Sequence, residues 1–136
     1  MDLGELVPRH KADLESARAA VAAGYPAVEP VLEALLHWLQ DANWPVAHEL
    51  IPFLSSIGAP LVPHIERVLR SDDLTWKYWV IGLLIPSLPA HAAAVFRPEL
   101  ERLCARPEAA ERVEGLDQQA REVLERFGWD GNASAL

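Results

Sequence analysis

The amino-acid sequence predicts an all-α protein built from about three stacked helix pairs. A segment that begins with proline and has a helical apolar pattern recurs at Pro30–Leu36, Pro63–Leu69 and Pro98–Cys104, and its prolines lie 33 and 35 residues apart. Self-similarity with a period in the low thirties indicates stacked supersecondary units. A single unit is too small to bury its own apolar face, so neighbouring units must stack into a continuous core. We therefore expect paired helices throughout and no strands.

The first unit is predicted as two helices, over residues 12–23 and 27–40. Gly24 and Pro26 end the first helix, since neither residue favours helical continuation. In the second helix, apolar residues fall on two neighbouring stripes. These are Val28, Leu32, Leu35, Leu36 and Leu39 on one stripe, and Ala27, Val31, Ala34 and Trp38 on the other. A helix that is apolar on two sides lies between neighbours, as an interior layer should.

The second unit is predicted to begin after Asp41, where Asn43 is expected to cap a helix that ends at Gly58. Its partner helix covers residues 60–70. In the third unit, Asp73 is expected to cap a helix over 74–88, followed by one near 93–105. Pro52 and Pro86 lie inside helical segments, where a missing N–H should bend the helix.

A one-sided apolar stripe then predicts a helix that closes the C-terminal end of the stack. The stripe consists of Leu116, Ala120, Val123, Leu124 and Phe127. We expect residues 1–130 to form a single domain and residues 131–136 to be a disordered tail.

The internal proline of the first helices and the Asp in the turns resemble HEAT-type repeats, which implies a right-handed α-α superhelix. More narrowly, Leu6–Leu14, the motif Gln40-Asp-Ala-Asn-Trp-Pro-Val46 and the motif Trp76-Lys-Tyr-Trp79 resemble a small bacterial family known only as a domain of unknown function. That resemblance covers about residues 6–90. It implies an all-α HEAT-like domain and brings no activity, cofactor or catalytic residue with it.

Composition narrows the classes of partner. The chain has 136 residues, a net charge of −8 and 51% hydrophobic residues. Basic residues form no stripe that could neutralise phosphates, so we expect neither nucleic acid nor an anionic membrane as a partner. The acidic N-terminus is unlike a signal peptide, and Cys104 is the only cysteine, which favours the cytoplasm. We predict no cofactor.

Two features are candidates for a binding site. The first is a cluster of aromatic residues around Lys77, in which we expect Trp76 and Trp79 to point inward and Lys77 and Tyr78 outward. The second is a ladder of polar residues at four-residue spacing, Glu29, Glu33, His37 and Asp41, which lie on one face if the helix reaches Asp41. Glu66 and Arg70 repeat Glu33 and His37 in the next unit. The candidate binding residues are Glu33, His37, Asp41, Asn43, Trp44, Glu66, Arg70, Asp73, Trp76 and Lys77.

These features favour a non-enzymatic module that binds a protein with a basic surface through its acidic helical-repeat face, since no catalytic signature is present. A toxin antidote (an immunity protein) is a special case that rests on analogy alone. Two alternatives stay open. One is a metal-dependent hydrolase that uses Glu33, His37, Asp41 and Asp73, although we predict no metal site, because zinc usually requires more histidine or cysteine. The other is a small-molecule binder with the tryptophan cluster as its pocket.

Overall fold

The computed structural model describes residues 2–130, and within this range the chain is all-helical with no strand. The all-α prediction is therefore confirmed. The α-helices are α1 (Leu14–Ala23), α2 (Leu32–His37), α3 (Pro45–Ile57), α4 (Val62–Arg70), α5 (Leu74–Trp79), α6 (Ala90–Ala93), α7 (Arg97–Ala105), α8 (Ala109–Glu114) and α9 (Leu116–Phe127). The 3₁₀ segments are η1 (Leu3–Leu6), η2 (Glu29–Val31), η3 (Trp38–Gln40), η4 (Ala59–Leu61), η6 (Ile85–Ser87) and η7 (Ala94–Phe96), and η5 (Val80–Leu84) is a π-helix.

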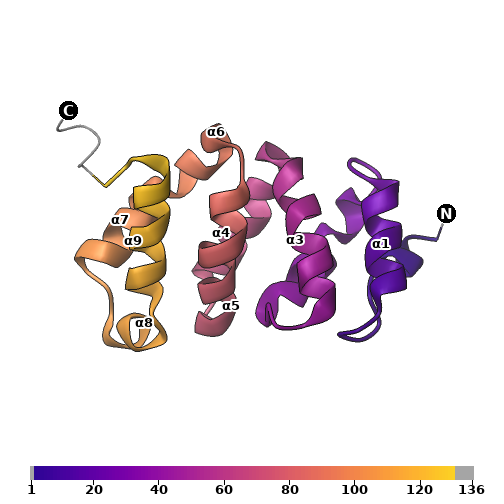
Figure 1. Cartoon of the computed structure of the whole chain (residues 1–136), viewed down its shortest axis with the longest axis horizontal. Helices are drawn as coiled ribbons and strands as arrows, with labels where there is room; N and C mark the ends of the chain where they lie inside the picture. Colours follow the sequence, from indigo (N-terminus) through magenta and orange to yellow (C-terminus); the bar gives the residue numbers. More distant parts are fainter. Residues whose placement is uncertain (1, 131–136) are drawn as a thin grey trace.

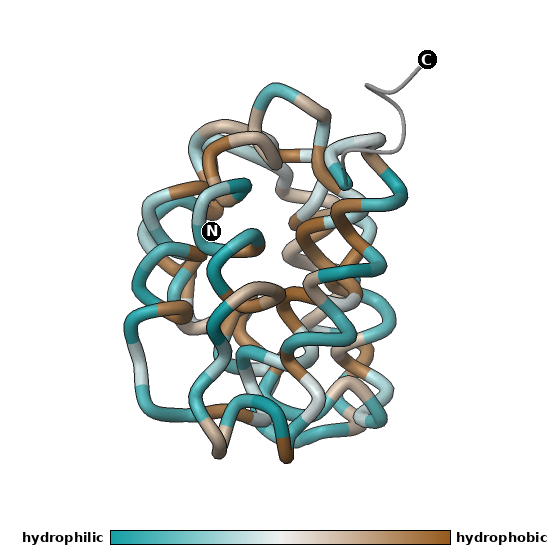
Figure 2. The backbone as a smooth tube through the Cα atoms, turned by 90° about the vertical axis from the view of Figure 1, so that its left-hand side faces the viewer, coloured by the Kyte–Doolittle hydropathy of each residue, from teal (hydrophilic) through white to brown (hydrophobic). Residues whose placement is uncertain are grey.

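The helices follow one another along the long axis of the molecule, from the N-terminus to the C-terminus (Figure 1). Helix α1 packs against α3, α3 packs against η5 and η6, and these pack against α9. In addition, α2 packs against α4, and α7 packs against α9. Viewed along the stack, hydrophobic and hydrophilic residues alternate within each helix (Figure 2). The longer helices α1, α3, α4, α7 and α9 each bury some of their residues and expose others.

Two of the predicted long helices are divided into shorter segments. The helix predicted over 27–40 is η2, α2 and η3 in succession, and the one predicted over 74–88 is α5, η5 and η6. Pro86 explains the second division, because it has no N–H with which to continue the α-helical pattern. Helix α3, in contrast, continues as an α-helix across Pro52.

The helix ends agree with the sequence in part. Asp73 caps α5 by accepting a hydrogen bond from the Trp76 N–H at 3.0 Å, as predicted. The prediction that Asn43 caps α3 is wrong. Trp44 holds that position without a side-chain cap, and Pro45 opens the helix. Gly58 ends α3 with φ of 74°, a backbone conformation that favours glycine.

The predicted core positions are confirmed in the helices that carry the repeat. The first stripe of the 27–40 segment is buried throughout, while Ala27 is exposed and Val31, Ala34 and Trp38 are half-buried. In α9 the stripe from Leu116 to Leu124 is also buried. Cys104 is half-buried and unbridged, and burial raises the pKa of its thiol. The predicted tail, 131–136, lies outside the described residues.

Among residues 2–130, no single helix is long and apolar enough to cross a bilayer. The segments Pro45–Ile57 and Ala59–Arg70 reach the length and hydrophobicity of a membrane span only when they are taken together. The two segments are bent by 112° relative to each other.

Candidate functional site

A pocket between α2 and α4 gathers three of the predicted binding residues. Helix α2 contributes Glu33, Leu36 and His37, helix α4 contributes His64, Arg67 and Val68, and α5 contributes Trp76. We call these seven residues the α2–α4 groove. Its volume is about 140 Å³. An apolar cavity of about 150 Å³ holds one benzene-sized group, so the groove is large enough for a single side chain.

Trp76 forms the aromatic wall of this groove and ties α5 to α2. Its indole N–H donates a hydrogen bond of 3.1 Å to the carbonyl of Leu36, 40 residues away. The Leu36 carbonyl lies in the last turn of α2, where it also accepts a hydrogen bond from the Trp38 N–H, so the indole adds a second donor at this helix end. The rings of His37 and Trp76 lie 4.7 Å apart at an interplanar angle of 32°. Trp76 is therefore fixed in position by its own structural contacts.

His64 is the unusual polar group of the groove. Its side chain is 14% exposed, with Nε2 3.9 Å from Glu29 and Nδ1 3.7 Å from Glu33. Both distances exceed hydrogen-bonding range. Within the described part of the chain, Nδ1 of His64 is buried and has no hydrogen-bond partner. Such a group loses free energy of about 1–3 kcal/mol relative to a satisfied one.

Glu33 and Arg67 form an ion pair at the mouth of the groove. Their side chains are 57% and 61% exposed, and an exposed pair of this kind contributes only about 0–1 kcal/mol. The pair can therefore open at little cost. Because Arg67 of α4 pairs with Glu33, α4 itself partly neutralises the acidic face that the sequence predicted.

The next groove along the stack lies between α4 and α7 and repeats the first. Glu66, Leu69 and Arg70 stand 33 residues after Glu33, Leu36 and His37 and line this second pocket in the same way. Its opposite wall is formed by Val95, Phe96, Pro98 and Glu99, and its volume is about 330 Å³. We call it the α4–α7 groove. Here Glu66 pairs with Arg70 of its own helix, at 3.4 Å, and Val95 is 51% exposed.

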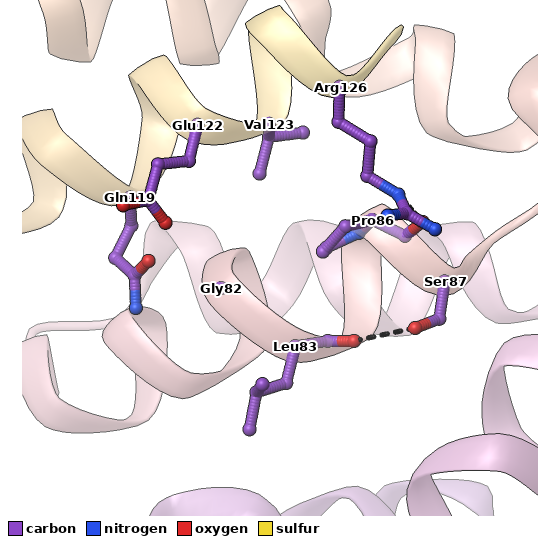
Figure 3. Close-up of a pocket in the computed structure, with 8 residues that line it drawn as sticks. All are labelled: Gly82, Leu83, Pro86, Ser87, Gln119, Glu122, Val123 and Arg126. Atoms are coloured by element: carbon purple, nitrogen blue, oxygen red, sulfur yellow. Dashed lines mark hydrogen bonds between the residues drawn. The ribbon is translucent and has the colours of Figure 1, made fainter.

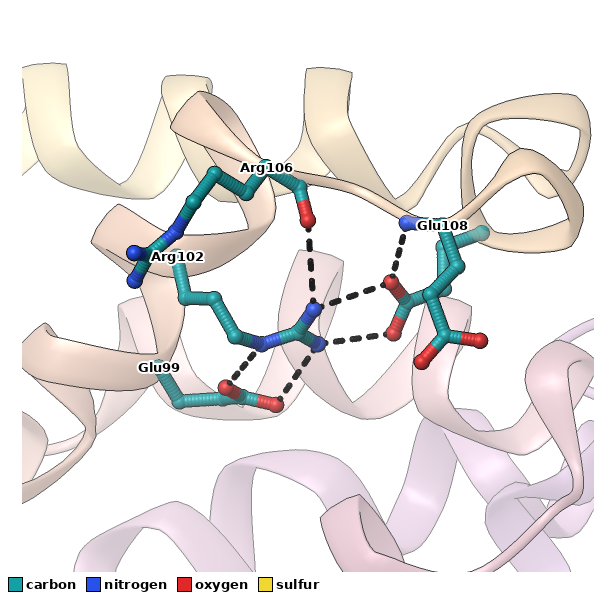
Figure 4. Close-up of polar contacts among 5 residues, drawn as sticks. Glu99, Arg102, Arg106 and Glu108 are labelled. Carbon is teal, nitrogen blue, oxygen red and sulfur yellow. Dashed lines mark hydrogen bonds and ion pairs between the residues drawn. The ribbon is translucent and has the colours of Figure 1, made fainter.

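Arg102, which is 35 residues after Arg67, makes a different set of contacts. It donates hydrogen bonds to both oxygens of Glu99 and to both oxygens of Glu111 (Figure 4). Its hydrogen bonds to these carboxylates raise the pKa of Arg102 and lower that of Glu111. Glu111 is 8% exposed and also accepts a hydrogen bond from the Glu108 N–H, which closes the capping box of α8. This network joins α7 to α8.

A further pocket, of about 370 Å³, lies between η5, η6 and α9 (Figure 3). Arg126 reaches across it and donates a hydrogen bond of 3.0 Å to the carbonyl of Pro86. The Gln119 side chain lies so close to Gly82 that a Cβ there would be 2.3 Å from its Nε2. These contacts join α9 to the preceding unit, so we assign this pocket a structural role.

The remaining predicted residues lie outside the two grooves. Asp41 accepts a hydrogen bond from the Asn43 N–H at 2.8 Å in the turn before α3. Trp44 packs edge-on against Trp38 at 5.6 Å. Asp73 caps α5, and Lys77 is half-buried.

Two expectations need correction here. The polar ladder does not reach Asp41, because α2 ends at His37 and Asp41 has an extended backbone. The predicted inward and outward split of positions 76–79 is also wrong. All four residues are half-buried, and Tyr78 packs against the core with Trp76.

Within residues 2–130, no three His, Cys, Asp or Glu side chains are grouped so that they could hold a metal ion. In particular, Glu33, His37, Asp41 and Asp73 do not converge. The residues chosen for the metal hypothesis therefore form no centre.

His64 and Arg67 are the polar groove residues that the sequence analysis missed. Their signal is present in the repeat itself. His64 follows Pro63, the second residue of α4, and Arg67 lies three residues further along the same face. Once α2 and α4 are placed side by side, these positions face the acidic positions of α2.

The fold and the grooves define an all-helical domain, over the described residues, with pockets between α2 and α4 and between α4 and α7. A family profile described as a domain of unknown function, DUF5071, matches residues 6–124. The chain therefore belongs to this family, and the predicted membership in a domain-of-unknown-function family is confirmed. A search of curated proteins finds no match.

Proposed function

We propose that the protein is a non-enzymatic interaction module that holds a segment of a partner protein in the α2–α4 groove. We also propose that its helix pairs form a HEAT-like superhelix of about three repeats with α9 as the cap, a form that presents long surfaces to partners. The single observation that carries the function is the pocket between α2 and α4, which is lined by Trp76 and by the charged pair Glu33 and Arg67.

The size of the groove favours a protein side chain over a free metabolite. Small-molecule sites usually measure about 300–1,000 Å³ and enclose most of the ligand. The α2–α4 groove, at about 140 Å³, is smaller than this range. Tryptophan is enriched where interfaces concentrate their binding energy, and Trp76 is held rigidly here. A rigid wall costs little entropy when a partner docks.

Affinity purification from the native host tests the function. The bait is the wild-type chain, compared with a double variant that reverses one charge in each groove, Glu33→Lys with Glu66→Lys. The matched control, Glu15→Lys with Glu122→Lys, makes the same charge change on exposed residues of α1 and α9. We expect one stoichiometric protein to bind the wild type and the control and to be lost from the groove variant.

Equal thermal stability of the three baits excludes loss through unfolding. Retention of the same proteins by all three baits would place the interaction on another surface. Absence of any stoichiometric protein would overturn the proposed module.

A further inference from the structure

We infer that the partner protein inserts an aromatic side chain, that of a tyrosine, into the α2–α4 groove, with its ring inside and its hydroxyl group at the mouth. This inference rests on the proposed function and names the kind of side chain that the groove takes. Three observations carry it: the volume of the groove, the side chains that line it and the balance of charge at its mouth.

The volume of the groove matches one aromatic ring. At about 140 Å³, it is close to the volume of about 150 Å³ at which an apolar cavity in a protein binds benzene. A smaller side chain would leave part of the space empty and would forfeit dispersion contacts with the lining. The ring of a phenylalanine or a tyrosine therefore has the right size for this space.

Aromatic and apolar side chains form the wall and the base of the groove. Trp76 and His37 belong to the wall, and their ring centroids lie 4.7 Å apart. Leu36 and Val68 are almost completely buried and form the base. Aromatic rings attract further rings at centroid separations of about 4.5–7 Å, in stacked or edge-to-face arrangements. A ring from a partner would extend this aromatic contact over an apolar base, against a wall that the indole hydrogen bond of Trp76 already fixes.

The charges of the groove are already balanced, which favours a neutral occupant. Glu33 pairs with Arg67 at the mouth, and the unpaired Nδ1 of His64 is buried, so it offers nothing to a ligand. A lysine side chain would have to compete with Arg67 for Glu33, and a glutamate side chain with Glu33 for Arg67. A phenol hydroxyl is neutral and can both donate and accept a hydrogen bond, so it can bind the ion pair without separating it. The polar mouth therefore favours tyrosine over phenylalanine.

Binding of side-chain probes to the full chain tests this inference. The probes are the N-acetyl amides of tyrosine, phenylalanine, leucine, lysine and glutamate, which share their end groups and differ only in the side chain. NMR follows binding through the indole N–H of Trp76 and the backbone N–H of Val68. We expect the tyrosine probe to bind with a dissociation constant in the millimolar range, since a ligand this small makes few contacts. The phenylalanine probe should bind about three- to tenfold more weakly, because it lacks one hydrogen bond, and the other three probes more weakly still.

A histidine variant tests whether the ring lies against the aromatic wall. His37→Ala removes one of the two rings of the wall and should weaken the tyrosine probe about three- to tenfold, the scale of one aromatic pair. The control, His48→Ala, changes an exposed histidine of α3 outside the groove and should leave the affinity unchanged. Thermal unfolding of both variants excludes loss of the fold as the cause.

A double variant tests the position of the hydroxyl group. Glu33→Gln with Arg67→Met removes the ion pair at the mouth, so the tyrosine and phenylalanine probes should bind this variant equally. The control, Arg18→Met with Glu49→Gln, removes an exposed ion pair between α1 and α3 and should keep the preference for tyrosine.

Three results would overturn the inference. The first is that any of the other four probes binds at least as tightly as the tyrosine probe. The second is that no probe shifts the groove signals, and the third is that the wild type and His37→Ala bind the tyrosine probe equally. None of them affects the purification experiment, which can still show that a protein binds this face, so the two proposals can fail separately.

Discussion

The α2–α4 and α4–α7 grooves share one equivalent wall, Glu33, Leu36 and His37 in the first and Glu66, Leu69 and Arg70 in the second, and yet differ in how their charges are satisfied. In the first, Arg67 reaches back to Glu33 of the preceding helix. In the second, Arg102 turns away from Glu66 and binds Glu99 and Glu111. The cause is α8, which follows α7 and brings the buried Glu111 within reach. Repetition therefore preserves the packing positions, while the local neighbours decide which groove keeps polar groups available for a ligand.

The largest difference between the grooves should appear at their equivalent leucines. Leu36 is 1% exposed, whereas Leu69 is half-buried. We expect Leu36→Ala to lower the free energy of unfolding by about 2–5 kcal/mol, because it leaves a cavity in the core. Leu69→Ala should cost about 2 kcal/mol or less, since part of that side chain remains in water. Urea unfolding of both variants measures this, and equal losses would show that the grooves are packed alike.

The equivalent arginines give the next largest difference. Arg102→Met removes the partner of the nearly buried Glu111 and should cost about 3 kcal/mol. Arg67→Met removes only an exposed partner of Glu33 and should cost less than about 1 kcal/mol. Thermal and urea unfolding compare the two variants directly. A cost for Arg67→Met as large as that for Arg102→Met would mean that the first groove is closed by its ion pair and is not available to a ligand.

The sequence predicted the features that recur and missed those that depend on neighbours. The period placed the second helices and their buried faces correctly, since the position of Leu32 or Leu36 in the core follows from spacing alone. It also identified Glu33, His37 and Trp76 as candidates. The pairing of Glu33 with Arg67 was missed, because it depends on how α2 and α4 are aligned across the interface.

The incorrect predictions have local physical causes. The ladder to Asp41 failed because α2 ends at His37, where the indole of Trp76 binds the Leu36 carbonyl from another unit. Such a contact, 40 residues apart, leaves no periodic signal. Helix α8 was missed because it lies outside the repeat, although Glu108 and Glu111 have the spacing of a capping box.

The two tryptophans at corresponding turns provide a smaller test. Trp76 binds the Leu36 carbonyl, whereas Trp44 packs edge-on against Trp38. Trp76→Phe keeps an aromatic wall but removes the indole donor, so it should cost about 1–2 kcal/mol. Trp44→Phe should cost about 1 kcal/mol or less, because an aromatic contact remains. Urea unfolding measures both, and the reverse order would mean that the indole hydrogen bond does not hold α5 against α2.

Lowering the pH should reduce the free energy of unfolding through Glu111, which joins α8 to α7 beside the second groove. The hydrogen bonds from Arg102 are the main reason that the pKa of Glu111 lies below its ordinary value of 4.5, and the backbone N–H of Glu108 lowers it further. A carboxyl whose pKa is lowered by folding stabilises the native state above its unfolded pKa, and this contribution is lost as the pH falls through the folded pKa. Glu111→Gln removes the titrating group, so its free energy of unfolding should fall less than that of the wild type between about pH 7 and about pH 3. Urea unfolding across this range compares them, with Arg102→Met expected to behave like Glu111→Gln. Identical pH dependence in all three proteins would show that the carboxylate is not held by Arg102, and the contrast between the two grooves would then lose its electrostatic basis.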